Sequence, residues 1–265
     1  MNRCRFWSVV LAGILVLPSV AVAADPAKDA LDKGKASLDK KDYDAAIRAF
    51  TEAIRLDTKN AEAYGNRSRA YALNGNFDKA FSDCNEAIRI NPKLALAFWE
   101  RGSIYGERGD LDKSIADCTE AIRLKPDYAE AYYNRGLIYR RKADFDKAIA
   151  DYTEAIRLKP DFAQAYLNRG VAFGNKSDSY KEIADYTNAI RLSPKYSEAY
   201  YDRGFAYGSK GEREKATADY TAAIRLAPKF AQAYFNRGLI YQEIGDKAKA
   251  DEDFAQAKKL GINAP

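Results

Sequence analysis

Residues 129–162 read AEAYYNRGLIYRRKADFDKAIADYTEAIRLKPDF and carry two helical patterns in succession. In the first half, Tyr132, Gly136 and Tyr139 recur at the spacing of one helix face. Ala143 and Asp144 interrupt the pattern as a turn. The second half, residues 145–158, places these residues on one face: Ala148, Ile149, Tyr152, Ala155 and Ile156. Pro160 ends that helix, because proline disfavours helical backbone in the residue before it. The stretch predicts two antiparallel helices.

The same pattern recurs along the chain at a fixed interval of 34 residues. The arginine of the first helix returns at Arg67, Arg101, Arg135, Arg169, Arg203 and Arg237. The proline after the second helix returns at Pro92, Pro126, Pro160, Pro194 and Pro228. Self-similarity at this period indicates stacked supersecondary units. One helix pair cannot bury both of its apolar faces, so the units must pack against one another.

The repeating residues resemble the tetratricopeptide-repeat (TPR) family. Its pattern has a large residue at position 4, a small one at 8, aromatics at 11 and 24, alanine at 20 and 27, and proline at 32. Residues 129–162 match it with Tyr132, Gly136, Tyr139, Ala148, Tyr152, Ala155 and Pro160. The related pentatricopeptide RNA-binding proteins have a 35-residue period, which this chain does not show.

The resemblance covers residues 27–264 and implies an all-α, right-handed superhelical solenoid of antiparallel helix pairs. It divides the chain into seven units: 27–60, 61–94, 95–128, 129–162, 163–196, 197–230 and 231–264.

Three units depart from the pattern. The first has Ala30 and Ser37 in place of aromatics, as expected of a terminal repeat. The last ends with a polar helix around residues 251–259, which caps the stack itself or is covered by a partner or a second copy. The fifth has Glu182 in place of alanine, and we expect its turn at residues 177–179 to be loosened or its second helix to start at a shifted position.

Two internal comparisons predict specific contacts. Units two to seven carry arginine at position 7 and aspartate at position 23, whereas unit one carries Lys33 and Ala49. Because the two features occur together, we expect each arginine to pair with the aspartate of its own unit, against the alternative of a solvated row of charges. Cys84 and Cys118 occupy position 24 of adjacent units. Equivalent points on packed helices lie about 8–10 Å apart, farther than a disulfide allows, so we expect buried free thiols.

Residues 1–23 are typical of a signal peptide, followed by a short linker at 24–26. Arg3 and Arg5 precede an apolar run from Phe6 to Val20, and Ala21-Val22-Ala23 forms a small-x-small cleavage site. We therefore expect a periplasmic or secreted protein with no integral membrane segment after cleavage. The alternative is an uncleaved membrane anchor.

The composition excludes several function classes. The chain has no histidine, the commonest general base and metal ligand, and its three cysteines have no metal-binding spacing. Its net charge of +5 is too small and too dispersed for a nucleic-acid-binding face. No phosphate loop or nucleophile motif occurs, so we expect no enzyme and no cofactor.

The inner surface of a TPR solenoid is lined by the first helix of each unit, where positions 5, 6 and 9 share a face. We expect a partner-binding groove made by Asn66, Arg69, Trp99, Tyr133, Asn134, Leu137, Asn168, Tyr201, Phe205, Phe235, Asn236 and Leu239. Charge predominates in the early units and apolar and aromatic surface in the later ones. The alternative is that these side chains pack within the solenoid.

The leading interpretation is a non-catalytic scaffold that holds a peptide or protein segment in this groove. The alternative is a carbohydrate or peptidoglycan binder that uses Trp99, Tyr133, Tyr201 and Phe235 as stacking platforms. Self-association through the C-terminal end is a further expectation. The TPR mode that grips a C-terminal carboxylate is excluded, because no unit has lysine at position 5 or asparagine at position 9.

Overall fold

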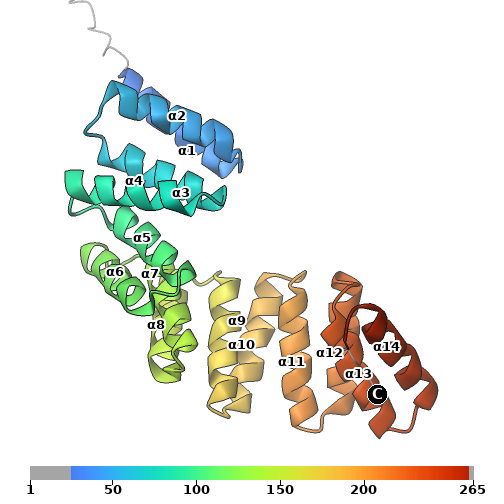
Figure 1. Cartoon of the computed structure of the whole chain (residues 1–265). Helices are drawn as coiled ribbons and strands as arrows, with labels where there is room; N and C mark the ends of the chain where they lie inside the picture. The colour runs from blue at the N-terminus through green and yellow to red at the C-terminus, as the bar shows by residue number, and fades with distance from the viewer. Residues whose placement is uncertain (1–24, 263–265) are drawn as a thin grey trace, which may run out of the picture.

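The computed structural model describes residues 25–262, which form fourteen α-helices and no strand (Figure 1). The helices are α1 (Pro26–Asp39), α2 (Tyr43–Leu56), α3 (Ala61–Leu73), α4 (Phe77–Ile90), α5 (Ala95–Glu107), α6 (Leu111–Leu124), α7 (Ala129–Arg141), α8 (Phe145–Leu158), α9 (Ala163–Asn175), α10 (Ser179–Leu192), α11 (Ser197–Ser209), α12 (Arg213–Leu226), α13 (Ala231–Glu243) and α14 (Lys247–Lys259). Each consecutive odd–even pair forms one hairpin, which we call repeats 1 to 7 in chain order.

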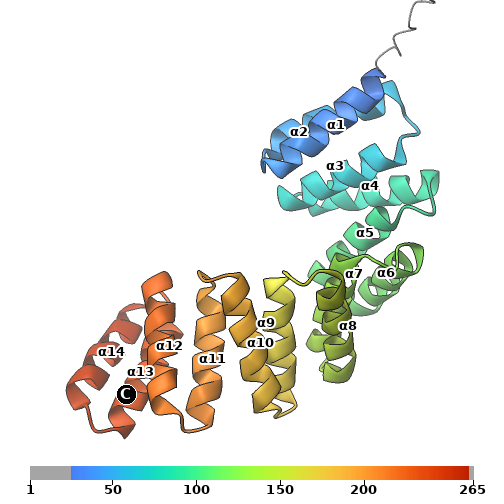
Figure 2. The ribbon, with the colours of Figure 1, turned by 180° about the vertical axis from the view of Figure 1, so that it is seen from behind.

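The hairpins stack into a curved solenoid, which confirms the predicted fold class. Each helix packs on the next along the chain. Odd-numbered helices also contact one another from repeat to repeat, whereas within the described residues no two even-numbered helices do. The odd-numbered helices therefore line the inner, concave side of the curve. Figures 1 and 2 show α5 to α8 at a bend between the N-terminal repeats and the row from α9 to α14.

Every hairpin turns through a residue with positive φ at position 15. Four of these are glycines and three are not: Lys41, Gly75, Gly109, Ala143, Ser177, Gly211 and Gly245. The prediction of a loosened turn or a shifted helix start in repeat 5 is wrong. Helix α10 begins 34 residues after α8, as the period requires, and Ser177 has a φ of 61°, positive like the φ of the equivalent residue in every other repeat.

Small residues set the distance between the two helices of a hairpin. In repeat 4, Ala148, Tyr152 and Ala155 are completely buried. Gly136 on the facing helix allows the Tyr152 ring to approach, because a Cβ there would lie 2.8 Å from it. The aromatic position is taken by cysteine in repeats 2 and 3. Cys84 and Cys118 are free and buried as predicted, and burial raises the pKa of each thiol to about 12.

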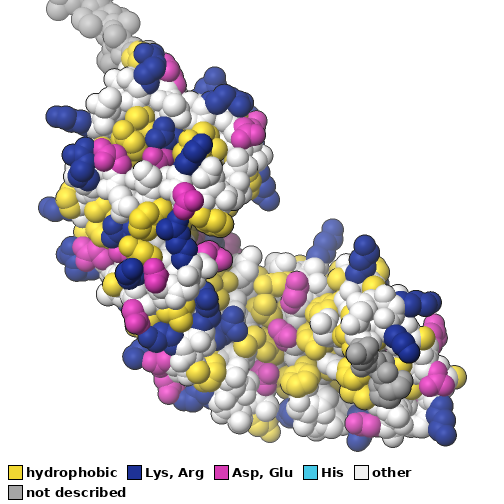
Figure 3. Space-filling view, in the orientation of Figure 1, with side chains coloured by type: hydrophobic (Ala, Val, Ile, Leu, Met, Phe, Trp, Pro, Cys, Tyr) yellow, Lys and Arg dark blue, Asp and Glu magenta, His cyan; other side chains and the backbone are white. Residues whose placement is uncertain are grey.

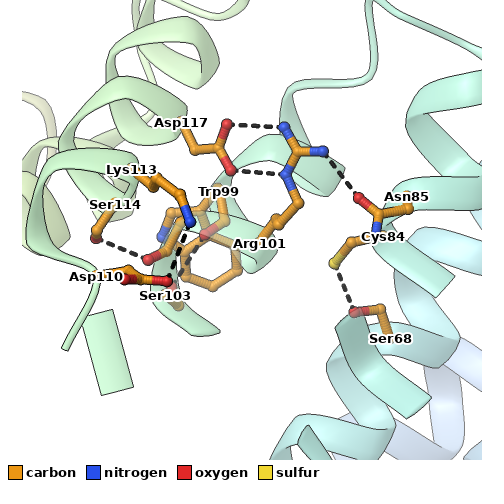
Figure 4. Close-up of polar contacts among 11 residues, drawn as sticks. Ser68, Cys84, Asn85, Trp99, Arg101, Ser103, Asp110, Lys113, Ser114 and Asp117 are labelled. Atoms are coloured by element: carbon orange, nitrogen blue, oxygen red, sulfur yellow. Dashed lines mark hydrogen bonds and ion pairs between the residues drawn. The ribbon is translucent and has the colours of Figure 1, made fainter. Parts of the chain in front are cut away.

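The predicted arginine–aspartate pairs are confirmed. All six arginines donate two hydrogen bonds, from Nε and Nη2, to the aspartate of their own repeat at 2.7–2.9 Å. Each also donates from Nη1 to a side chain of the preceding repeat. Figure 4 shows Arg101 between Asp117 on α6 and Asn85 on α4. In the other repeats this acceptor is Thr51, Thr119, Thr153, Thr187 or Thr221.

No helix in residues 25–262 is both long enough and apolar enough to cross a membrane. The predicted signal peptide, residues 1–23, lies outside the described residues.

Candidate binding groove

The concave face contains a row of small depressions. Equivalent positions of successive repeats line them, so they follow one another at intervals of one repeat. Each lies between positions 9, 12 and 13 of one repeat and positions 6, 9 and 13 of the next, and we call each an inter-repeat notch. Cavities open in the notches between repeats 1 and 2 (about 320 Å³), between repeats 3 and 4 (about 270 Å³) and between repeats 6 and 7 (about 210 Å³). Several predicted groove residues, from separate repeats, line these notches.

The three open notches differ in chemistry. Lys35, Asp39, Asn66, Arg69, Leu38 and Leu73 line the notch between repeats 1 and 2. The notch between repeats 3 and 4 combines Leu137 and Ile138 with Ser103, Asn134, Glu107, Arg140 and Arg141. The notch between repeats 6 and 7 combines the apolar side chains of Phe205, Leu239 and Ile240 with Tyr220, Asn236, Arg213 and Glu243.

The asparagines at position 6 leave an acceptor free. Asn134 Nδ2 donates to Ser103 Oγ at 2.6 Å, whereas Asn168 Nδ2 and Asn236 Nδ2 donate to the hydroxyls of Tyr133 and Tyr201. Asn66 Nδ2 donates to the carbonyl of Glu62. Among residues 25–262 their Oδ1 atoms accept no hydrogen bond. The donors thus fix each amide, and the oxygens remain available to an N–H donor.

The aromatic side chains are mostly not free platforms. Tyr133 packs on Phe162 with ring centroids 4.7 Å apart, and Tyr201 packs on Phe230 at the same distance. Trp99 packs on Tyr128 at 5.4 Å, and Phe235 on Phe254 at 5.9 Å. All four are half-buried. Phe205 differs, with 55% of its surface exposed. The alternative that these side chains pack within the solenoid therefore holds in part, because each half-buried ring packs on at least one neighbouring ring.

The notch between repeats 2 and 3 is filled by the chain itself. The Arg69 guanidinium lies over the Trp99 ring, 5.5 Å from its centroid, and its Nε is 3.7 Å from Glu100 Oε1. Glu100 is 4% exposed, and its Oε1 atom has no hydrogen-bond partner. Burial raises the pKa of Glu100 to about 8, against the attraction of Arg69. Sequence reasoning placed Arg69 and Trp99 in the groove but missed Glu100, although it is an acid at a position where four repeats have asparagine.

Comparison with known proteins concerns both sequence and fold. Sequence profiles described as tetratricopeptide repeat match residues 31–95, 129–162, 163–196 and 231–260. A profile described as TPR repeat matches residues 102–143 and 207–245. A 40-residue segment is 55% identical to the heat shock protein sti1 homolog of Schizosaccharomyces pombe, but it covers 15% of this chain and 7% of that protein.

Three solved structures illustrate the shared fold. A tetratricopeptide repeat protein from Parabacteroides merdae is 22% identical with a TM-score of 0.62, over 91% of this chain and 95% of that one. YrrB, described as a TPR protein with an unusual peptide-binding site, is 21% identical with a TM-score of 0.58, over 71% and 97%. PilF from Pseudomonas aeruginosa is 15% identical with a TM-score of 0.70, over 84% and 97%. At these identities the likeness concerns the fold alone.

Proposed function

The chain belongs to the tetratricopeptide-repeat family, and we propose that it is a non-catalytic interaction scaffold that holds an extended segment of a partner protein in its concave groove. TPR proteins as a class support protein–protein interaction. The observation that carries the proposal for this groove is the row of inter-repeat notches beside free asparagine oxygens. An extended peptide offers the matching groups, namely side chains at regular intervals and backbone N–H donors between them.

Several features favour a peptide over a carbohydrate. Sugar binding needs an aromatic face on which a ring can stack, and Trp99, Tyr133, Tyr201 and Phe235 each give part of their surface to a neighbouring ring. In the notch between repeats 2 and 3, the face of Trp99 is covered by Arg69. By contrast, Phe205 and Leu239 border a cavity of about 210 Å³, which suits one apolar side chain.

A matched set of charge insertions tests the groove. Peptides that bind the purified protein are selected from a random 12-residue library, and their affinities are measured by fluorescence anisotropy. Leu239→Glu and Leu137→Glu place a charge in two notches and should each weaken binding about tenfold or more. Ala218→Glu places the same charge on exposed α12, outside the groove, and should leave affinity unchanged. Equal losses from all three variants, or binding of glycans in place of peptides, would overturn the proposal.

We also propose that the protein works in the cell envelope, in the periplasm or secreted. The support is the leader pattern of Arg3, Arg5, the apolar run and Ala21-Val22-Ala23. N-terminal sequencing of protein recovered from the periplasmic or secreted fraction should begin at residue 24. A full-length N-terminus in the membrane fraction would instead identify an uncleaved anchor.

A further inference from the structure

The cavity between repeats 3 and 4 is lined by two adjacent arginines that have no counterpart in the other repeats. Arg140 and Arg141 stand at positions 12 and 13 of repeat 4, at the end of α7, and both border the cavity of about 270 Å³. The other six repeats have no lysine or arginine at either position, and three of them have an acid at position 13. Because the repeats are copies of one another, this pair of cations is a specific feature of one notch.

The guanidinium of Arg140 has no partner within the protein. Among residues 25–262 its side chain takes part in no ion pair and no hydrogen bond, although twenty-three ion pairs occur in that part of the chain. Its Nε atom is buried without an acceptor. A buried donor that lacks an acceptor costs stability. By contrast, the six arginines at position 7 each bond an aspartate, so Arg140 is an unsatisfied cation at the wall of a cavity.

Arg141 is fixed in place but keeps donors to spare. Its Nη1 atom donates to the backbone carbonyl of Gly106, on α5 across the notch, at 2.6 Å. Within the described residues its other nitrogens donate to no acceptor, and it forms no ion pair. The notch between repeats 6 and 7 shows the contrast, because Glu243 at the same position accepts a hydrogen bond from Arg213 Nε at 2.9 Å. A charge at position 13 is neutralised there and remains unneutralised here.

The other groups around the cavity leave a carboxylate as the matching ligand. Glu107 is the one acid in the lining, and it is exposed, so two cations stand against one anion. Ser103 Oγ already donates to the carbonyl of Trp99 and accepts from Asn134 Nδ2. The free hydrogen-bond donors of the notch are therefore those of the arginines. In Figure 3, Lys and Arg side chains are frequent over the bend formed by α5 to α8, and hydrophobic and acidic ones over α9 to α11.

We propose that the cavity between repeats 3 and 4 binds an aspartate or glutamate side chain of the partner segment, with its carboxylate held by Arg140 and Arg141. The inference rests on the proposed function and names the chemistry of one residue of the ligand. The planar guanidinium matches a carboxylate with two parallel hydrogen bonds. The groove continues through further repeats on both sides of this cavity, which suits a side chain within a segment and not the carboxylate at its end.

Peptide selection on the purified protein tests this inference, with Arg140→Gln as the main variant. Peptides from the random 12-residue library should share an acidic residue, and replacing it by its amide should weaken binding about tenfold or more. Arg140→Gln should cause a loss of similar size, and the two changes together should cost little more than either alone. Its melting temperature should match that of wild type, because Arg140 makes no bond in the free protein.

Three controls separate this site from other sources of charge. Arg191→Gln removes an exposed arginine on α10, outside the groove, and should leave affinity unchanged. Glu107→Gln removes the opposing acid of the same cavity and should strengthen binding. Amidation of the peptide's C-terminus should have no effect, whereas loss of binding on amidation would assign the carboxylate to the chain end and overturn the inference.

Two further outcomes would overturn the inference and leave the proposed function standing. One is a set of selected peptides without an acidic residue that Leu239→Glu still weakens. The other is an equal affinity of wild type and Arg140→Gln for the same acidic peptide. Failure to select any groove-binding peptide would overturn both the inference and the proposed function.

Discussion

At the scale of single residues, two acidic groups in the groove are held in surroundings that disfavour their charge. Glu100 is buried with its Oε1 atom 3.7 Å from Arg69 Nε, and the negative charges of Glu182 and Glu198 act on the partly buried Asp202. In both cases burial is the main cause of a raised pKa. A raised carboxylate pKa means that the ionised form costs stability in the folded protein. Residues that reduce stability at a concave surface are expected where binding requires them.

Glu100→Gln should therefore stabilise the protein at high pH. The folded pKa of about 8 lies above the ordinary value of 4.5, so the contribution of Glu100 is fully present below pH 4.5 and is lost as pH rises through 8. The variant should resemble wild type at pH 4 and exceed its free energy of unfolding by about 1–3 kcal/mol at pH 9. Urea denaturation at both pH values measures this difference, with exposed Glu107→Gln as the control. Destabilisation at pH 9 would contradict the assignment.

Removal of the Arg135 charge should destabilise the protein, in contrast to removal of the Glu100 charge. Its guanidinium bonds Asp151 twice and Thr119 once, and it lies over the rings of Tyr132 and Tyr139. Arg135→Ala leaves the Asp151 carboxylate without its cation, at a side-chain exposure of 8%. We expect a loss of about 2–4 kcal/mol in the free energy of unfolding.

The double variant Arg135→Ala/Asp151→Ala separates the pair from its surroundings. It should recover part of the loss, because no buried charge remains without a partner. Equal melting temperatures for Arg135→Ala and wild type would mean that the pair contributes nothing.

At the scale of elements, the hairpin turns of three repeats hold a residue other than glycine at positive φ. A left-handed residue other than glycine costs about 1–2 kcal/mol, and Ala143 has a φ of 58°. Ala143→Gly should raise the free energy of unfolding by about 0.5–1 kcal/mol, whereas Gly109→Ala at the equivalent position should lower it by a similar amount. Urea denaturation of the two variants measures both effects. A Gly109→Ala protein as stable as wild type would show that the turn does not constrain its residue.

The sequence predicted these elements well because each repeat is an internal copy of the others. The joint occurrence of arginine at position 7 and aspartate at position 23 was sufficient to predict their pairing. The bond to the preceding repeat was missed, because Thr51 and its counterparts lie on an exposed helix face where threonine is unremarkable. The sequence did contain a signal for this bond. Position 25 is threonine or asparagine in repeats 1 to 6, each of which precedes a repeat with the arginine, and is Ala255 in repeat 7, which precedes none in the described residues.

The groove was predicted less completely, for a physical reason. Helical spacing assigns a residue to the concave face but does not determine how exposed its side chain is. At position 5, the exposure depends on the aromatic residue at position 34 of the same repeat, such as Phe162 or Phe230, which packs against the ring. The pattern could not rank Phe205 above Tyr201. It also gave no reason to expect the Glu182 carboxylate beside α9, because that placement depends on Gly174 in a different helix.

At the scale of the whole molecule, the ladder of arginines and the row of notches arise from the same stacking. Each arginine joins two repeats and so fixes the step between them, and that step sets the spacing of the notches. The lining of the notches then varies along the groove, from Lys35, Asp39 and Arg69 between repeats 1 and 2 to Phe205 and Leu239 between repeats 6 and 7. The outer face of α14 is polar and its inner face buries Ala250, Phe254 and Ala257 against α13, as expected of a helix that caps the stack.

Photo-crosslinking tests the claim that the concave face holds the partner segment. A benzoylphenylalanine residue is placed at Leu137 or Leu239 on the concave face, or at exposed Ala150 or Ala218 on the even-numbered helices, and each protein is irradiated with the same library-selected peptide. We predict crosslinks from the two concave positions alone, with mass spectrometry locating different peptide residues for each. Crosslinks from the even-numbered helices, or none from the concave positions, would contradict the account.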